Sequence, residues 1–262
     1  AKKIQAAPIK GNKKYLQENK EFQAVIVNSG NANCFTGKQG MKDAQETTRY
    51  LSDVLCLKKE SILVASTGII GRRLPLNKIK KAIPALVNGL SKDGIDQAKK
   101  AIMTTDTFSK EITVKFNLAG KTVTVCGIAK GAGMIAPDLA TMLSFIFTDA
   151  KITQAALDKA LSIAVNNSFN CVTVDGCMST NDSVMLLANG AAGNSLIDSV
   201  RGFNLFLKAL NIACLELAKM IAKDAEGATK FIQVKVSGAK NFLDARKAAL
   251  SIANSNLFKT AM

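Results

Sequence analysis

The segment EITVKFNLAGKTVTVCGIA at 111–129 restricts the fold more than any other, because apolar and polar residues alternate on both sides of Ala119-Gly120. Alternation with a period of two predicts half-buried strands, and a short turn with glycine between two such strands predicts a β-hairpin. A hairpin belongs to an antiparallel sheet, unlike the strands of a purely parallel, doubly wound sheet. We therefore expect sheets with one polar or differently packed face.

Strand and helix patterns are mixed along the rest of the chain, so the class is α/β or α+β. The 262 residues and 48% hydrophobic content suffice for one large domain or two modest ones. The helix at 76–90 is expected to break near Pro84, and Asp149 or Thr153 to cap the helix at 149–169. Strands are expected within 22–34, 61–71 and 231–239, and helices over 41–57, 76–90, 149–169, 199–223 and 241–255. The segment 171–190 is expected to begin with a strand, continue as a polar loop and end as a strand or a helix.

The net charge of +15 is compatible with a nucleic-acid binder or with a solvated lysine surface. Arginine occurs at only five positions, aromatic residues make up 5% and tryptophan is absent. Base readout and bidentate phosphate contacts favour arginine, so we expect a lysine surface that attracts anionic substrates and no nucleic-acid partner. The apolar runs are too short or too interrupted to span a bilayer, so no membrane partner is expected either.

The six cysteines form no C-x-x-C pair, and no histidine is present to complete a common zinc site. Scattered cysteines are typical of buried thiols in a reducing compartment, which predicts a cytoplasmic location. The opening AKKIQAAPIK shows no signal peptide and is typical of sequence within a protein, so residues upstream are expected.

Four loops that each follow a strand combine small residues with hydroxyls or amides, the composition expected of a site. KGAG at 130–133 lacks the lysine and hydroxyl that follow the glycines of a phosphate-binding loop, which disfavours nucleotide binding. The pair Thr67-Gly68 could offer a hydroxyl and an N–H to an oxyanion, or form a simple turn. The loops are 28–33, 66–71, 130–141 and 174–183.

Asp175 and Asp182 in the loop VDGCMSTNDS could bind Mg²⁺ or Ca²⁺. Their spacing does not match the ligand pattern of an EF-hand. A turn held by Asx and Ser/Thr side chains is therefore the favoured interpretation.

The absence of histidine decides which nucleophiles are feasible, since it excludes Ser-His-Asp and Cys-His chemistry within this chain. A lysine, a carboxylate or a free α-amine remains as base. Thr141 would supply an α-amine if the bond after Ala140 were cut, and its pKa of about 7.7–8.0 suits a general base. Pro137 and the glycines at 131 and 133 could hold the loop for such a cut. Alternatively, Thr141 is an ordinary strand residue before MLSFIF.

At these residues the chain resembles the ornithine acetyltransferase family of arginine biosynthesis, also called glutamate N-acetyltransferase. The central block is specific, because family precursors cleave themselves at its Ala-Thr bond. The matching segments are QAAPI, VNSGNANC, STGIIGRRLPLNKI, AIMTTDTFSK, AKGAGMIAPDLATMLSFIFTDA, FNCVTVDGCMSTNDSVMLLANG, DAEGATKFIQVKVSGA and SNLFKTAM, in family order.

The resemblance implies a role for particular residues. Thr141 would be the nucleophile, freed by cleavage after Ala140, which divides the chain into parts 1–140 and 141–262. Thr67 and Gly68 would stabilise the oxyanion. The implied substrate contacts are Thr104, Lys130, Thr141 and Glu226, with Thr105 and Thr107 as alternatives to Thr104.

The resemblance also implies a ping-pong reaction without metal or organic cofactor. Thr141 would take acetyl from N-acetylornithine and give it to glutamate, and some family members also accept acetyl-CoA. The family fold has stacked β-sheets flanked by helices, and the cleaved halves associate as α2β2.

This chain departs from the family at Ala225, where the family motif DGEGATK has glycine, and at Cys177-Met178. The family also extends before QAAPI and after KTAM. Two other functions stay open: a non-catalytic basic binding protein on the same scaffold, and a related self-cleaving threonine amidase or peptidase. NSGNANC and TTDT favour the transferase.

Overall fold

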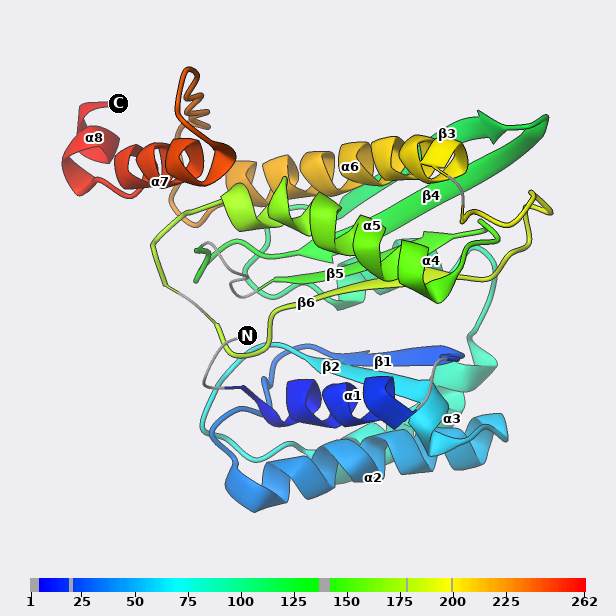
Figure 1. Cartoon of the computed structure of the whole chain (residues 1–262). Coiled ribbons are helices and arrows are strands. Elements are labelled where there is room, and N and C mark those ends of the chain that lie inside the picture. Colours follow the sequence, from blue (N-terminus) through cyan, green and yellow to red (C-terminus); the bar gives the residue numbers. More distant parts are fainter. Residues whose placement is uncertain (1–4, 19–20, 137–141, 178, 199) are drawn as a thin grey trace. The chain divides into compact units, whose positions relative to one another are not determined.

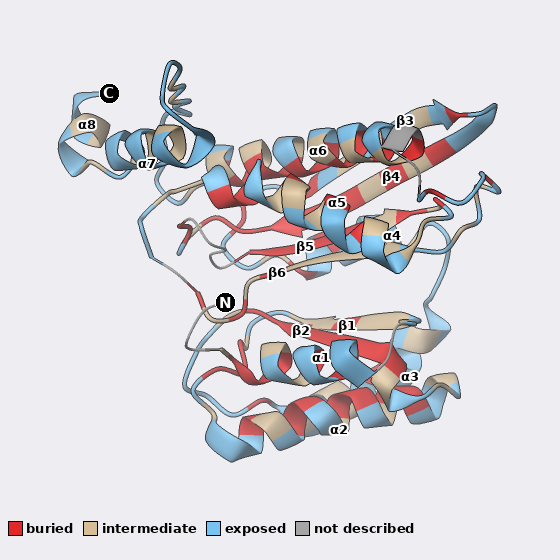
Figure 2. Ribbon diagram, viewed as in Figure 1, coloured by how far each residue is buried: buried red, intermediate tan, exposed pale blue. Residues whose placement is uncertain are grey.

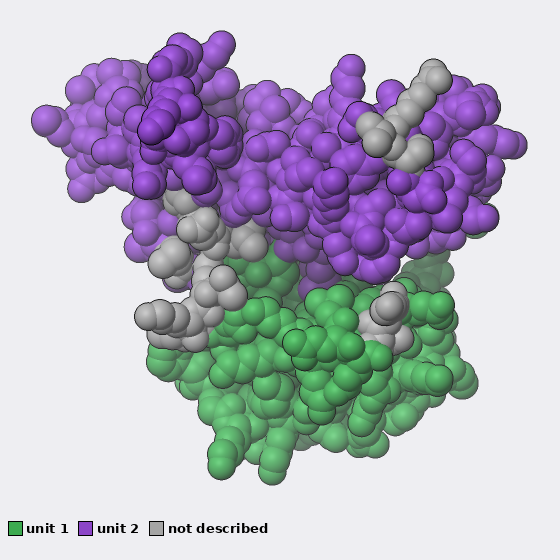
Figure 3. All heavy atoms as spheres, in the orientation of Figure 1, with its two compact units in different colours: residues 1–104, 180–183 green, residues 105–179, 184–262 purple. Residues whose placement is uncertain are grey.

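The chain has a mixed α/β fold in which helices flank β-sheets, as the sequence predicts (Figure 1). The computed structural model describes residues 5–18, 21–136, 142–177, 179–198 and 200–262. The chain divides into two compact units, which are residues 1–104 with 180–183, and residues 105–179 with 184–262 (Figure 3). The two units are defined by packing, whereas the predicted division after Ala140 is a chemical cleavage. That division stays a prediction, as does the predicted stacking of the sheets.

Unit 1 is built on two parallel strands, paired from Ala24↔Ile62 to Asn28↔Ser66. Parallel neighbours need a crossover, and α2 provides it. The apolar sides of α2 and α3 pack on these strands in a core of Ile26, Ala44, Leu51, Ile62, Val64 and Ile83. The elements are β1 (Ala24–Asn28), β2 (Ile62–Ser66), α1 (Ala7–Glu18), α2 (Gly37–Leu55), α3 (Leu76–Asn88), α4 (Ile95–Ala101) and the 3₁₀ turn Lys59–Ser61.

The helix break predicted near Pro84 is wrong, because α3 continues through this residue. Proline removes the N–H that would bond to the carbonyl four residues earlier, at Lys80. Pro84 is exposed and Lys80 half-buried, so water can hydrate that carbonyl, while Ile83 anchors the helix in the core.

Unit 2 contains a four-stranded sheet in the order β3-β4-β5-β6, with β3–β4 and β4–β5 antiparallel. The predicted hairpin is confirmed: Ala119 and Gly120 have φ of +51° and +82°, as a two-residue type I′ turn requires. The elements are β3 (Lys110–Leu118), β4 (Lys121–Lys130), β5 (Leu143–Thr148), β6 (Ser183–Ala188), α5 (Gln154–Asn166), α6 (Val200–Lys223), α7 (Phe242–Ala253), α8 (Asn256–Ala261) and the 3₁₀ turn Phe169–Cys171.

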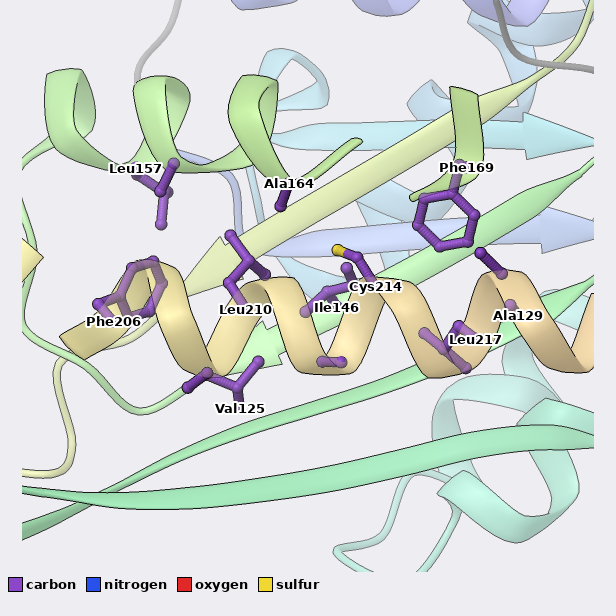
Figure 4. Close-up of a cluster of buried hydrophobic side chains, with 14 of the residues drawn as sticks. Val125, Ala129, Ile146, Leu157, Ala164, Phe169, Phe206, Leu210, Cys214 and Leu217 are labelled. Atoms are coloured by element: carbon purple, nitrogen blue, oxygen red, sulfur yellow. The ribbon is translucent and has the colours of Figure 1, made fainter. Parts of the chain in front are cut away.

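The main core of unit 2 lies between the sheet and the helices α5 and α6. Figure 2 shows buried positions along β4, β5 and one side of α6. Thr153 caps α5, since its hydroxyl accepts the N–H of Ala156, whereas Asp149 accepts the N–H of Thr124 instead. The core includes Val125, Ala129 and Ile146 from the strands, Leu157 and Ala164 from α5, and Phe206, Leu210, Cys214 and Leu217 from α6 (Figure 4).

Two predicted strands are wrong, those at the start of 171–190 and at 231–239. The described residues of both segments lack strand pairing, apart from β6 at the end of the first. A strand is stable only when its N–H and C=O groups meet those of a neighbour, and alternation alone does not supply the neighbour.

All six cysteines are free thiols, but only Cys34 and Cys214 are buried, so the expectation of generally buried thiols is wrong. Burial raises the pKa of the Cys214 thiol to about 12. Within the described ranges, no helix is both long enough and apolar enough to cross a bilayer.

Replacing Leu210 tests whether α6 supplies the core of unit 2. Leu210 is fully buried, so Leu210→Ala is expected to lower the free energy of unfolding by about 2–5 kcal/mol. Leu215, 41% exposed on the same helix, is the control, and Leu215→Ala should cost less than about 1 kcal/mol. Urea unfolding measures both, and equal losses would contradict this account of the core.

Candidate active site

Lys130 is the last residue of β4 and its side chain is only 2% exposed. Its ammonium nitrogen lies 3.8 Å from Oδ2 of Asp106, whose side chain is completely buried. Lys130 is therefore not a solvated lysine at the end of a strand, and burial of its ammonium group requires compensation by anionic or polar groups.

Lys130 belongs to a buried ion network formed by Asp106, Lys110, Lys130 and Asp224. Lys110 Nζ donates to Oδ1 of Asp106 at 2.7 Å and also to Oδ2 of Asp224. The N–H and the hydroxyl of Thr107 donate to Asp224 as well. Each of the four charged side chains is at most 2% exposed, and their formal charges cancel. Pairing and hydrogen bonding offset the high cost of removing these charges from water.

Glu226 lies two residues beyond Asp224 and reaches the glycine loop that follows Lys130. Its N–H donates to the carbonyl of Ala132 at 3.0 Å. A Cβ placed at Gly133 would lie only 2.6–2.7 Å from the Glu226 carboxyl group, so the absence of a side chain at Gly133 gives the carboxylate its place. Ala225, where the family has glycine, is not among the residues with positive φ, so this backbone conformation does not require glycine.

Asp175 holds the same loop from its other side. Its carboxylate accepts the N–H groups of Met134 at 2.6 Å, Ile135 at 3.0 Å and Cys177 at 2.9 Å. Met134 has a φ of +57°, which is unfavourable for a side chain with a Cβ, and the two hydrogen bonds stabilise this conformation. The predicted Asx-type turn at Asp175 is thus confirmed.

Loop 131–136 is therefore fixed at both ends and in the middle. The carboxylate of Asp106 accepts the N–H of Gly131 at 2.6 Å, and the N–H of Glu226 and the carboxylate of Asp175 hold the rest. This loop leads toward the predicted cleavage site. Pro137, Ala140 and Thr141 lie outside the described residues.

The Thr67-Gly68 turn of unit 1 follows β2. Gly68 has a φ of +128°, and a Cβ on it would lie 2.3 Å from the carbonyl carbon of Gly30. The N–H groups of Thr67 and Ile69 donate to Asn28 and Gly30. Among the described residues the N–H of Gly68 between them donates to none, which leaves it as a hydrogen-bond donor for a ligand oxygen.

Side-chain amides of the loop NSGNAN hold this turn in place. Ser66 donates its hydroxyl to Asn28 Oδ1 at 2.7 Å, and Asn28 Nδ2 donates to the carbonyl of Asn31 at 2.8 Å. Asn31 forms bridges with Thr67 and Ile69. The two loops 28–33 and 66–71, which are separate in the sequence, thus form one structure.

The predicted site residues fall into two groups. Lys130 and Glu226 are joined in unit 2 through loop 131–136, whereas Thr67 and Gly68 are adjacent in unit 1. Thr104 is exposed in unit 1. The hydroxyl of Thr107 donates to Asp224, which disfavours Thr107 as a substrate contact.

Sequence reasoning missed Asp106, Lys110 and Asp224. All three lie inside segments on which the family resemblance rests, AIMTTDTFSK and DAEGATKFIQVKVSGA. The sequence did show that Asp106 and Asp224 lie close to the predicted substrate contacts Thr104 and Glu226. The burial of the two carboxylates and their pairing with Lys110 depend on contacts between distant segments, which sequence patterns do not reveal.

Comparisons with known proteins match the whole chain to one family. The ArgJ family model matches residues 1–262. An arginine biosynthesis bifunctional protein ArgJ of Caldanaerobacter subterraneus subsp. tengcongensis is 49% identical over 261 residues, which cover 99% of this chain and 64% of that protein. A glutamate N-acetyltransferase of Methanocaldococcus jannaschii is 49% identical over 264 residues, with the same two coverages. The chain thus spans 64% of the length of these two relatives.

Among solved structures, an ornithine acetyltransferase of Mycobacterium tuberculosis complexed with ornithine aligns with a TM-score of 0.48 and 35% identity. This alignment covers 53% of the present chain and 73% of that chain.

A methyl group at Gly68 tests the close approach of the two loops in unit 1. Gly68→Ala should destabilise the protein by about 1–3 kcal/mol more than Gly71→Ala, because its Cβ would overlap the backbone of Gly30. Gly71 is a matched control, since its φ is +76° but its Cβ would have open space. Urea unfolding compares them, and equal losses would contradict a tight contact at Gly68.

Proposed function

Since this chain belongs to the ArgJ family, we propose that it transfers an acetyl group from N-acetylornithine to glutamate through Thr141. The family match over the whole chain is the observation that carries this proposal. The function assigned to a relative that shares 49% of its residues, glutamate N-acetyltransferase, supports the same reaction.

The first step is self-cleavage. The Thr141 hydroxyl attacks the carbonyl of Ala140, the amide becomes an ester and water hydrolyses it, giving fragments 1–140 and 141–262. The new α-amine of Thr141 is the general base that a chain without histidine otherwise lacks. The rigid hold on loop 131–136 supports this step, because a fixed backbone lowers the entropy cost of placing a reacting group.

The second step is a ping-pong transfer. Thr141 Oγ attacks the acetyl carbonyl of N-acetylornithine while its α-amine takes the hydroxyl proton and passes it to the departing amine of ornithine. The amine of glutamate then attacks the acetyl ester, N-acetylglutamate leaves and the hydroxyl is restored. The Thr67 hydroxyl and the Gly68 N–H stabilise the negative oxygen, and the uncommitted N–H of Gly68 among the described residues supports this assignment.

Lys130 and Glu226 bind the charged groups of the amino-acid substrates, together with Thr104. The opposite charges of Lys130 and Glu226 match the carboxylate and ammonium groups that such substrates carry. Loop 131–136 joins these two residues, which supports a common site. The resemblance alone supports the finer proposals of acetyl-CoA as a second donor, α2β2 association and a cytoplasmic location. The proposed reaction needs no metal or organic cofactor.

Self-cleavage is tested by the fragments that the purified protein yields. The protein should give two fragments, and the smaller should begin Thr-Met-Leu on N-terminal sequencing. Thr141→Ala should remain in one piece on a denaturing gel, because it lacks the attacking hydroxyl. A fragment with any other first residue would contradict the assignment of the nucleophile.

The oxyanion assignment is tested by Thr67→Ala. Loss of one such donor is expected to lower kcat by about 10²–10³, or roughly 2.7–4 kcal/mol, with little change in substrate affinity. Single-turnover acetylation of processed protein separates this effect from slower cleavage. Thr48→Ala is a control, since Thr48 is also buried in unit 1 and its hydroxyl donates to the carbonyl of Gln45. A rate for Thr67→Ala within about threefold of the wild type would remove Thr67 from the site.

A further inference from the structure

We propose that a cavity beside Glu226 receives the side chains of the amino-acid substrates, and that Lys259 binds the side-chain carboxylate of glutamate there. This inference rests on the proposed function, because it names how that site recognises its acceptor. It adds Lys259, a residue of α8, as a residue that determines specificity.

The cavity lies in unit 2 and has a volume of about 330 Å³. This volume is at the small end of ligand pockets, which span about 300–1,000 Å³, so it suits a ligand of amino-acid size. Three segments of the chain form its walls, because α7 and α8 lie near the end of α6 (Figure 1). The lining residues fall within 173–174, 222–234 and 253–262.

Two of the lining residues connect the cavity to the glycine loop 131–136. The N–H of Glu226 donates to the carbonyl of Ala132 at 3.0 Å, and the N–H of Val174 donates to the carbonyl of Ile135 at 2.7 Å. The cavity therefore adjoins the loop that precedes Thr141 in the sequence.

Lys259 presents a positive charge to this cavity. Its side chain is half-buried, and its ammonium group donates to the carbonyl of Val174 at 2.6 Å. Among the described residues it has no carboxylate partner, so two of its three N–H donors remain for a ligand. Lys230 lines the same cavity, and its ammonium group donates to the backbone carbonyl of Met262. A cation whose protein partner is a neutral carbonyl attracts an anionic group of a ligand.

The carboxylate of Glu226 gives the same cavity a charge of the opposite sign. Glu226 is exposed, and its carboxylate forms neither a hydrogen bond nor an ion pair with the described part of the chain. The proposed reaction binds two side chains in turn, that of ornithine with an ammonium group and that of glutamate with a carboxylate. Glu226 attracts the first and Lys259 the second, while the apolar Phe231 and Phe258 suit the methylene groups of both.

The first measurement compares glutamate with glutamine, which has a neutral amide in place of the side-chain carboxylate. Each is titrated calorimetrically into the full processed protein without an acetyl donor, so that no turnover occurs. The wild type is expected to bind glutamate at least about tenfold more tightly, because a hydrogen bond to a charged group typically contributes that factor or more.

Lys259→Gln removes the charge, while its amide N–H can still donate to the carbonyl of Val174. This variant should bind glutamate at least about tenfold more weakly and glutamine with unchanged affinity. Lys259→Arg retains the charge and should keep the preference for glutamate. Lys240→Gln is the matched control, because Lys240 is exposed in the same unit and does not line the cavity, so its affinity for glutamate should equal that of the wild type.

Steady-state kinetics separate recognition from a purely structural role. Lys259→Gln should raise KM for glutamate, whereas KM for N-acetylornithine should not rise, since the ornithine side chain carries a positive charge. If Lys259 served only to attach α8 to Val174, its replacement would weaken the binding of glutamate, glutamine and N-acetylornithine alike.

Equal binding of glutamate and glutamine by the wild type would overturn the inference alone. A folded Lys259→Gln whose preference for glutamate stays within about threefold of the wild type would do the same. If Lys259→Gln does not fold, Lys259→Met, which keeps an apolar stem, gives the same reading. A wild type that transfers no acetyl group from N-acetylornithine to glutamate would overturn the proposed function, and the inference would fall with it.

Discussion

The arrangement of unit 2 around its candidate site depends on the buried ion network of Asp106, Lys110, Lys130 and Asp224. The network joins the start of β3, the end of β4 and the end of α6, and the Lys110–Asp224 contact spans 114 residues of sequence. Removing one partner from a buried ion pair typically costs about 3–5 kcal/mol, because a charge is left uncompensated. The sheet end, the helix end and the glycine loop 131–136 are therefore constrained together.

Unit 1 uses a steric constraint in place of an electrostatic one. The backbone of Gly30 and Asn31 approaches Gly68 so closely that no side chain fits there. This contact and the amide hydrogen bonds of Asn28 and Asn31 fix the position of the Gly68 N–H. The N–H groups on either side of it, those of Thr67 and Ile69, already donate to backbone carbonyls. A backbone donor held in this way needs no reorganisation when negative charge develops on a carbonyl oxygen, which is the property that an oxyanion site requires.

The features that sequence predicted correctly are local ones. The hairpin at Ala119-Gly120 and the long helix α6 follow from the repeat of apolar residues along a single segment. The predicted strand at 231–239 has the same alternation but no partner strand in the described chain, and partner choice is not encoded in periodicity. In the same way Lys130 has the local sequence of a solvated lysine, and only the approach of Asp106 from a distant segment makes it a buried one.

The central claim is that Thr141 carries the acetyl group between two amino acids. The most direct measurement is mass spectrometry of the processed protein after incubation with N-acetylornithine and no acceptor. The account predicts that the fragment beginning with Thr141 gains the mass of one acetyl group, that ornithine is released in equal amount, and that glutamate then removes the group as N-acetylglutamate. An acetyl group on fragment 1–140, or transfer to glutamate without any acetylated protein, would contradict it.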